Sequence, residues 1–563
     1  MPGWDATYAG IGPGDRVTGA PFAGRSTVWG AHGAAATAHP TATLVAIDVL
    51  RAGGSAMDAA IAANIALGFL EPIACGLGGD AFALLWDPAE RRVVGFNGSG
   101  RSPLGLSLET QRQRARRGHI HSHGAVSVST PGAVDAWGQL HARYGRLPWA
   151  DLFAPAIALA SEGAPMAQTV AHYIAISART FTRPGSGVEE TDNFRQVWMP
   201  GGRAPAESEM FANPALARTL GLVAAGGPRA FYEGEIAEII ERYFARIGGW
   251  MTRADLAAHR GEWVEPASSS YRGVDVWALG GNTQGLSTLQ MLNLLEHFDL
   301  ADMGFLSAPA LHLMLEAKRL AFEDRARYFA DPAFADIPTE WLVSKAYAAE
   351  RVKLIRKDRI LEPAFAGQAP GHGDTTYLCA ADNNGMMVSL IQSNFRGMGS
   401  GLAPDGLGFM LQNRGELFAL QDGHPNVYAP GKRPFHTIIP GFATYRGDPW
   451  LAFGVMGGDM QPQGQAQIIT SLLDFKLGLQ EAGDAPRWQH VGSAEPTGQP
   501  AAGRGQVWLE SGVPAATRAG LAALGWPIGD SPGQYGGYQA VLRLPGRYAA
   551  ASEMRKDGAA LAY

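Results

Sequence analysis

Two extended runs joined by a tight turn, at residues 375–394, constrain the fold of this chain more than any other segment. The segment reads TTYLCAADNNGMMVSLIQSN, and its Asn384-Gly385 pair suits the two-residue turn of a β-hairpin. A strand is therefore expected to begin at Thr375. It directly follows LEPAFAGQAPGHGD (361–374), a stretch too polar and flexible for a core element. We predict that this stretch is a cleavable linker.

The rest of the chain alternates helical and extended patterns. Apolar residues recur at helical spacing, and Ser55 suits the N-cap of one helix. Alternating runs bounded by turn residues predict strands. The expected helices cover 41–54, 56–70, 131–145, 149–163, a segment beginning at Asn213-Pro214, 308–332, 465–478 and 515–524; the expected strands lie in 81–97, 375–394, 448–458, 505–509 and 536–544. This mixture indicates an α+β protein.

Composition argues against several classes of partner. The 563 residues carry a net charge of −6 without a long basic stripe, whereas nucleic-acid binding depends on neutralised phosphates. The opening MPGWDATYAGIGPGDR lacks a basic stretch followed by an apolar run, and no window of about 18 apolar residues follows. Cys75 and Cys379 are too few for a disulfide framework. We expect a cytoplasmic protein with no nucleic-acid or membrane partner.

Three other motifs are better explained as structure than as chemistry. Residues 529–533, GDSPG, fit the G-x-S-x-G nucleophile elbow, but a strand follows where the elbow needs a helix, and no histidine follows to complete its triad. His119, His121 and His123 alternate in GHIHSHG, but no nearby carboxylate or cysteine completes a metal site. The glycines at 75–80 lack the strand-loop-helix order of a phosphate cradle. We interpret GDSPG as a turn, the three histidines as solvated loop residues, and the glycine segment as a helix-to-strand turn.

A threonine that opens a strand behind a flexible linker can also be a catalytic group. A Thr hydroxyl is a weak nucleophile unless a base lies beside it, and a free α-amino group on the same residue can be that base. Cleavage between Asp374 and Thr375 would create this amine. The pattern alone is weak, because Thr is a favoured strand residue.

The segment GDTTYLCAADNNGMMVSLIQSN resembles the nucleophile segment of the γ-glutamyltransferases, a family of N-terminal-nucleophile hydrolases. Five further blocks of the same family occur in order along the chain. They are HPTATLVAIDVLRAGGSAMDAAIAANIALGFLEP (39–72), YRGVDVWALGGNTQGLSTLQMLNLLE (271–296), HLMLEAKRLAFEDRARYFADP (312–332), GVMGG (454–458) and DAPRW (484–488). Six ordered blocks are much harder to produce by chance than one motif.

The resemblance implies a four-layer αββα sandwich and a precursor that cuts itself before Thr375. Residues 1–374 would form a large subunit and residues 375–563 a small one, intertwined as one domain; the sequence leaves open whether two such heterodimers pair. Thr375 would be the nucleophile, Ser393 would take the place of the threonine that supports it, and Gly457 and Gly458 would form the oxyanion hole. No metal or organic cofactor is implied.

The departures from the family pattern concern the substrate. Ser99 falls on the usual position of the substrate-binding arginine, and the arginine moves two places to Arg101. The acidic residue that binds the substrate amine is replaced by Leu417, and a neighbouring amide or acidic position is Arg414. A guanidinium pairs with a carboxylate in a planar fork. The part of the site that binds the substrate ammonium group in the family pattern is thus replaced by one that suits a carboxylate.

The predicted substrate is a small amide that carries a carboxylate, bound by Arg101, Arg414, His436 and Thr437, the last two of which replace a pair of serines. The combination of SNFRGMGSG (393–401) with LQNRGELF (411–418) resembles the subgroup that includes oxamate amidohydrolase. Arg396 and Glu416 are further candidates for the pocket wall, although each suits a surface position equally well.

Two other functions stay open, together with a second nucleophile. A γ-glutamyl hydrolase or transpeptidase would bind the substrate amine by another route and act on glutathione-like compounds. A non-catalytic homologue would keep the fold without the reaction. Thr376, the second member of the pair, is the alternative nucleophile.

Overall fold

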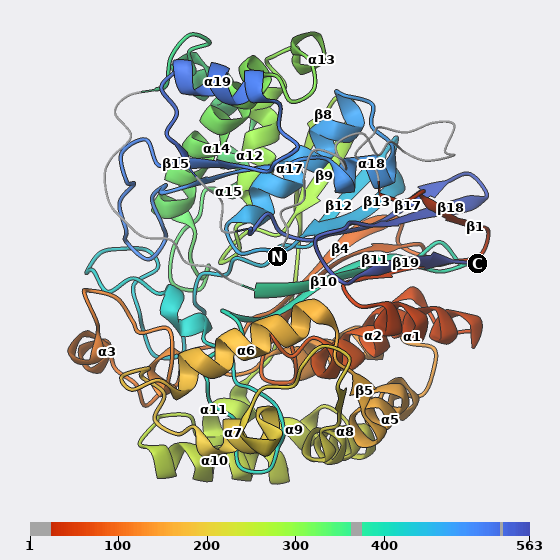
Figure 1. Ribbon diagram of the computed structural model, residues 1–563, viewed down its shortest axis with the longest axis vertical. Coiled ribbons are helices and arrows are strands. Elements are labelled where there is room, and N and C mark those ends of the chain that lie inside the picture. The colour runs from red at the N-terminus through yellow and green to blue at the C-terminus, as the bar shows by residue number, and fades with distance from the viewer. Residues whose placement is uncertain (1–23, 362–373, 530–532) are drawn as a thin grey trace, which may run out of the picture.

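Two facing β-sheets covered by helices on both outer sides form the centre of the molecule (Figure 1). The computed structural model describes residues 24–361, 374–529 and 533–563. Each of the two large sheets has seven strands. This arrangement confirms the predicted α+β fold and four-layer αββα sandwich.

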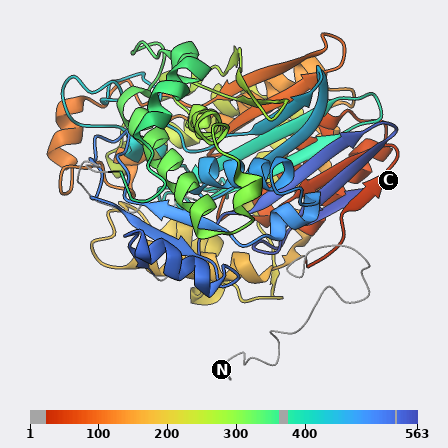
Figure 2. The ribbon, with the colours of Figure 1, turned by 90° about the horizontal axis from the view of Figure 1, so that it is seen from above.

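The first sheet has the strand order β1-β18-β17-β13-β12-β9-β8, and all its neighbouring strands are antiparallel. Its strands are β1 (Val28–Gly30), β8 (Ala267–Tyr271), β9 (Val274–Ala278), β12 (Gly441–Tyr445), β13 (Asp448–Val455), β17 (Tyr538–Leu544) and β18 (Arg547–Ser552). The helices α12 (Gly285–Leu295), α17 (Met460–Leu473) and α18 (Leu479–Asp484) pack on this sheet, and α14 (Ala308–Tyr328) packs on α12. Figure 2 shows α14, in green, in the helical layer beside the strands.

The second sheet has the order β19-β2-β10-β11-β3-β4-β7. Its strands are β2 (Ala34–Thr37), β3 (Asp80–Asp87), β4 (Arg92–Gly98), β7 (Glu262–Val264), β10 (Asp374–Ala381), β11 (Met387–Phe395) and β19 (Ala559–Ala562). The helices α1 (Pro40–Arg51), α2 (Ala56–Leu70) and α4 (Ala133–Tyr144) cover it. Both large sheets therefore combine strands from before and after Thr375.

The predicted hairpin at 375–394 is present, with β10 and β11 antiparallel and Gly385 at a φ of +87° in the turn. This hairpin lies in the middle of the second sheet, and Tyr377 and Ile391 project from it into the apolar layer between the sheets. Ser55 caps α2 in a reciprocal capping box with Asp58. The strand β10 begins one residue before the predicted start, at Asp374.

Most of the remaining elements before residue 260 form the helical region below α6 in Figure 1. The remaining helices and strands of the whole fold are given together. They are α3 (Leu108–Arg114), α5 (Ala154–Glu162), α6 (Gln168–Thr182), α7 (Asp192–Trp198), α8 (Pro214–Gly226), α9 (Arg229–Tyr232), α10 (Glu235–Ile247), α11 (Arg253–Ala258), α13 (Leu300–Met303), α15 (Thr339–Leu342), α16 (Lys345–Arg351), α19 (Ala515–Ala523), β5 (Ala164–Pro165), β6 (Met210–Phe211), β14 (Trp488–Val491), β15 (Gln506–Leu509) and β16 (Ile528–Gly529).

Both cysteines, Cys75 and Cys379, are buried free thiols. Within the three described ranges, no helix combines the length and the apolar character needed to cross a membrane. The predicted linker lies almost entirely outside the described residues, as does the centre of the GDSPG turn.

Candidate active site

Thr375 lies at an irregularity near the start of β10. Asp374 pairs with Phe395 and Thr376 pairs with Gln392, so the register shifts across Thr375. Such a bulge turns one side chain out of the regular alternation of a strand. The Thr375 side chain is nearly fully buried, and its Oγ1 accepts a hydrogen bond of 3.4 Å from Nε2 of Gln461. Gln461, on the first turn of α17, is a contact that sequence reasoning missed.

Ser393 lies on β11, the strand that pairs with β10. Its Oγ accepts a hydrogen bond from the Phe395 N–H at 2.7 Å. On the other side of β11, Ser393 is the register partner of Asp80 on β3. Ser393 therefore stabilises the end of β11 opposite the predicted scissile bond.

Gly457 and Gly458 lie between the end of β13 and the start of α17. Their φ angles are +103° and +56°, where a side chain would strain the backbone, and a Cβ at Gly457 would lie 3.1 Å from the Cα of Gly536. Neither N–H donates to an acceptor among the described residues. Two adjacent amide donors at a helix N-terminus are suited to stabilise a developing oxyanion.

A buried hydrogen-bond chain holds this loop from behind. Nε2 of Gln284 donates to the carbonyl oxygen of Gly458 at 2.8 Å and to that of Thr437 at 2.6 Å. Oε1 of Gln284 in turn accepts from Nη1 of Arg325 at 2.7 Å. Arg325 is fully buried and also binds Asp459 and Glu495, at 2.6 and 2.5 Å. Gln284 and Arg325 lie within the family blocks 271–296 and 312–332. Nothing in the local pattern of those blocks connects either residue with the glycine loop.

A cavity of about 320 Å³ opens beside Gly458. Side chains from far apart in the sequence line it: Arg116, His119, Ile120, His121, Ser122, Phe395, Arg396, Glu416, Leu417, Thr437, Asp459, Glu495, Thr497 and Gln499. Its volume lies within the usual range for small-molecule sites. The wall combines apolar side chains with polar ones and carries charges of both signs.

Arg414 is a fully buried guanidinium behind this wall. Its Nη1 donates to Oγ1 of Thr437 at 2.8 Å, and the guanidinium lies 4.3 Å from the ring centre of Phe395. Its Nε and Nη2 have no hydrogen-bond partner among the described residues. Burial lowers the pKa of Arg414 to about 9, although Asp80 and Glu416 oppose this shift. An incompletely paired buried cation favours an anion nearby.

Phe395 ends β11 with a φ of +79°, a conformation that is strained for a bulky side chain. Phe395 lines the cavity, and its ring lies close to two guanidinium groups, those of Arg414 and of Arg396, the latter 4.9 Å from the ring centre. Arg396 is itself paired with Glu416, its Nε donating at 2.7 and 2.8 Å to the two carboxylate oxygens. Both Arg396 and Glu416 thus belong to the wall, in the form of an ion pair.

His436 is buried beneath the cavity rather than in its wall. Its Nε2 lies 2.8 Å from Oδ2 of Asp80, and its ring packs edge-on against Phe82. Burial lowers the pKa of His436 well below its usual value, and burial raises the pKa of Asp80 to about 7. Both shifts favour uncharged groups, a neutral imidazole at His436 and, below about pH 7, a protonated carboxyl at Asp80.

Arg101 is not brought to the cavity. Its guanidinium binds Glu262 at 3.0 Å, Asp331 at 3.3 Å and the carbonyl oxygen of Gly431 at 3.3 Å, and it is absent from the lining residues. Local sequence could not reveal this, because the acidic partners come from two distant segments. Arg414, Thr437 and Gly458, by contrast, are brought together.

The histidines at 119, 121 and 123 differ in their surroundings. His119 and His121 line the cavity, whereas the ring of His123 packs against Phe181. The described residues hold no cluster of three or more His, Cys, Asp or Glu side chains placed to bind a metal ion.

Comparison with known proteins identifies the family of this chain. The family model described as gamma-glutamyltranspeptidase matches residues 42–563. The acylase ACY 1 proenzyme of Pseudomonas sp. (strain SE83) is 34% identical over 95% of this chain and 94% of its own length. The oxamate amidohydrolase proenzyme of Klebsiella pneumoniae is 34% identical over 81% of this chain and 85% of its own.

A third relative is the glutathione hydrolase-like YwrD proenzyme of Bacillus subtilis, 37% identical over 78% of this chain and 81% of its own. Among solved structures, a cephalosporin acylase from Bacillus halodurans superposes with a TM-score of 0.88 at 39% identity, covering 96% of this chain and 97% of that one. The chain therefore belongs to the γ-glutamyltransferase family and is an N-terminal-nucleophile amidohydrolase.

Proposed function

We propose that the protein is a threonine amidohydrolase that cuts its own chain before Thr375 and then hydrolyses a small amide bearing a carboxylate on its acyl part. The names of its relatives support the first step, since the acylase, the oxamate amidohydrolase and the glutathione hydrolase-like protein are all proenzymes. A large and a small subunit would then come from one precursor. A cytoplasmic location remains part of the proposal.

Self-cleavage would use the Thr375 hydroxyl and one water molecule. The hydroxyl would attack the carbonyl carbon of Asp374 and pass its proton to the peptide nitrogen of Thr375, which would leave as an amine, giving an ester between the Asp374 carbonyl carbon and Oγ1 of Thr375. Water would then hydrolyse the ester, releasing the Asp374 carboxylate and restoring the hydroxyl. A strand irregularity at this bond supports the step, because it removes the bond from the regular ladder.

Amide hydrolysis would then follow in two stages. The Thr375 hydroxyl attacks the substrate carbonyl while its own α-amine accepts the proton, and the N–H groups of Gly457 and Gly458 stabilise the oxyanion. The carbon–nitrogen bond breaks, and the α-ammonium returns the proton to the leaving amine. Water next attacks the acyl ester, giving the free acid and restoring Thr375.

The hydrogen bond from Arg414 to Thr437 is the observation that supports a carboxylate-bearing substrate. Oγ1 of Thr437 accepts a hydrogen bond from the buried Arg414, so the hydroxyl proton is left to donate elsewhere, and this side chain lines the cavity. A carboxylate is a strong acceptor for a hydroxyl that a nearby cation polarises. Leu417, on the same wall, provides no partner for an ammonium group. Oxamate and longer monoamides of dicarboxylic acids fit this description.

A second candidate is an amide with an amino-acid head group, as in glutathione. Three carboxylates line the cavity, at Glu416, Asp459 and Glu495, and provide a different route for binding an ammonium. Arg396 neutralises the first. Arg325 is shared by the other two, and burial raises the pKa of Glu495, so that a proton on Glu495 would complete the neutralisation of this pair. These pairings favour the carboxylate-bearing amide.

Intact-mass analysis and an ammonia-release screen test the proposal together. Self-cleavage before Thr375 gives pieces of 374 and 189 residues, and Thr375→Ala should give one persistent chain, which would also exclude a protease contaminant. The cleaved enzyme should release ammonia from oxamate, succinamate or glutaramate faster than it hydrolyses glutathione or γ-glutamyl-p-nitroanilide. Equal or faster turnover of the γ-glutamyl compounds would favour the second candidate. An uncleaved chain without turnover would indicate a non-catalytic homologue.

A further inference from the structure

Arg116 is a cation at the rim of the cavity beside Gly458. It lines the cavity and is exposed to solvent, whereas Thr437 and Leu417, which line the same cavity, are buried. The cavity therefore has a buried part at Thr437 and a solvent-exposed part at Arg116. A ligand that fills it can present one polar group to each part.

A tight turn fixes the backbone of Arg116. The Arg116 N–H donates to the carbonyl oxygen of His119 at 2.8 Å, and the His119 N–H donates to the carbonyl oxygen of Arg116 at 3.1 Å. The two residues between them, Arg117 and Gly118, have φ angles of +53° and +81°. Positive φ at both central positions is typical of the type I′ turn of a two-residue hairpin. Arg116 and His119 are thus paired across the turn, and both line the cavity.

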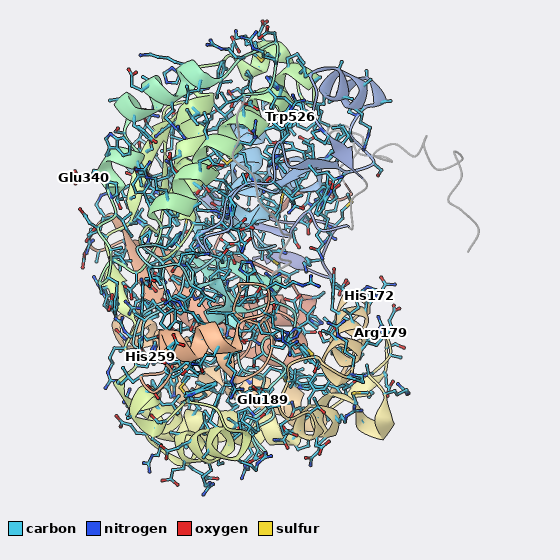
Figure 3. All side chains as sticks on the ribbon, turned by 90° about the vertical axis from the view of Figure 1, so that its left-hand side faces the viewer. His172, Arg179, Glu189, His259, Glu340 and Trp526 are labelled. Carbon is cyan, nitrogen blue, oxygen red and sulfur yellow. The ribbon has the colours of Figure 1, made fainter. Side chains whose placement is uncertain are left out.

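The segment 185–189 supports the same stretch of chain. The carbonyl oxygen of Gly185 accepts a hydrogen bond of 3.1 Å from Nη1 of Arg116. Glu189, labelled in the lower half of Figure 3, accepts from the Ala125 N–H with both carboxylate oxygens, at 3.2 and 3.0 Å. The Glu189 carboxylate is therefore engaged with the backbone a few residues beyond the turn.

Only neutral groups hold the Arg116 guanidinium within the three described ranges. Its Nη1 donates to the Gly185 carbonyl oxygen and, at 3.1 Å, to Nε2 of His121. Since a guanidinium can only donate, His121 accepts this bond as a neutral imidazole. Nε and Nη2 of Arg116 have no acceptor among the same residues. One edge of the guanidinium, with two parallel N–H groups, is thus available to a ligand.

The carboxylates of the cavity wall are already paired. Glu416 binds Arg396 at 2.6 Å, and Arg325 binds the other two carboxylates of the wall at 2.6 and 2.5 Å. Arg116, in contrast, forms no ion pair with any residue that the structure describes. The lining thus contains one cation without a counter-ion. A carboxylate suits this position, because its two oxygens match the planar fork of a guanidinium.

We propose that Arg116 binds a second carboxylate of the substrate, so that the preferred acyl group carries two. The first carboxylate is recognised through Thr437, which rests on the proposed function, and the second pairs with the available edge of Arg116 at the rim. Ile120, Phe395 and Leu417 line the same cavity with apolar side chains, which suit the carbon chain of such a molecule. The substrate class is then the monoamides of small tricarboxylic acids.

Binding of tricarboxylates tests Arg116 without turnover. Tricarballylate is glutarate with a further carboxylate on its central carbon, and butane-1,2,4-tricarboxylate is adipate with one further carboxylate. Titrated into the purified protein by calorimetry, each tricarboxylate should bind about three- to tenfold more tightly than its dicarboxylate, as expected for an ion pair at a partly exposed site. Arg116→Met should abolish this difference, and about 0.5 M NaCl should reduce it by screening.

Arg117→Met is the matched control, because Arg117 belongs to the same turn but does not line the cavity. It should leave the preference for tricarboxylates unchanged. Thr437→Val should weaken dicarboxylates and tricarboxylates alike. Equal binding of both members of each pair, or a preference that survives Arg116→Met, would overturn the inference.

Hydrolysis provides the second measurement. 3-Carboxyglutaramate should have a higher kcat/KM than glutaramate, and Arg116→Met should lower the former about three- to tenfold while changing the latter less than about twofold. Arg116-dependent binding of tricarboxylates without hydrolysis of either amide would support the site and count against the proposed function. Hydrolysis of glutaramate without any Arg116-dependent preference would support the proposed function and count against the site.

Discussion

Oγ1 of Thr376 donates a hydrogen bond of 2.6 Å to Oε2 of the buried Glu71, whereas the neighbouring Thr375 hydroxyl lies at the strand irregularity beside Gln461. The two candidate nucleophiles thus have different surroundings. The Thr376 hydroxyl already serves as a hydrogen-bond donor to Glu71, which gives it a structural role. The resemblance and this contrast both favour Thr375.

Thr376→Val should therefore leave self-cleavage at the same bond. Removing one donor from a buried carboxylate costs about 1–2 kcal/mol of stability, which thermal unfolding would register. Thr375→Ser keeps a hydroxyl and should still cleave, whereas Thr375→Ala should not. If Thr376→Val gave an uncleaved chain that unfolds normally, Thr376 would be the nucleophile.

Gln284→Leu should lower kcat by roughly 10- to 100-fold with little change in KM, because Gln284 holds the Gly458 carbonyl and thereby orients the predicted oxyanion donors. Gln290→Leu is a matched control on the same helix, since Nε2 of Gln290 binds Asp324 instead. Steady-state kinetics on both variants would separate the two effects. An equal loss of kcat in both would point to a general disturbance of α12.

Arg414→Met should raise KM for carboxylate-bearing amides about tenfold, the usual contribution of a hydrogen bond to a charged group. Thr437→Val should act in the same direction, because it removes the hydroxyl through which Arg414 reaches the cavity. An uncharged amide such as butyramide serves as the substrate control and should be unaffected. A rise in KM for both kinds of amide would argue against carboxylate recognition here.

Asp80→Asn should change how stability depends on pH. Burial raises the pKa of Asp80 to about 7, so the folded protein binds this proton more tightly than the unfolded chain. The contribution of Asp80 to stability must then fall as pH rises from about 4 to about 7, and stay constant above. Melting temperatures at pH 5 and pH 8 should differ less in Asp80→Asn than in the wild type. An equal difference in both proteins would place the titration elsewhere.

Local sequence signals predicted the positions of most of the major secondary-structure elements correctly. Asn384-Gly385 specifies a hairpin turn through positive φ, and Ser55 specifies a helix start through its capping bonds, so neither depends on distant residues. Boundaries were less exact: α17 begins at Met460 rather than near Gln465, because the Gly457-Gly458 loop fixes its start.

The surroundings of the predicted site could not be deduced in the same way. Arg101 pairs with acidic residues about 160 and 230 positions away, and Arg325 supports the glycine loop through Gln284, 41 positions from it in sequence. Such contacts depend on which strands and helices become neighbours, and no local pattern encodes that. His119 and His121 likewise face the cavity only because distant segments close around them.

The sequence by itself determined where the main helices and strands lie and that a threonine begins a strand, because hydrophobic periodicity and turn residues act over short distances. Its ordered motifs also carry the family resemblance, which implied the four-layer fold. The tertiary structure decided which polar groups lie together: Arg414 behind Thr437, Asp80 beside His436, and the side chains that line the cavity at Gly458. Burial makes these groupings consequential, since charges and hydrogen bonds act most strongly where water is excluded.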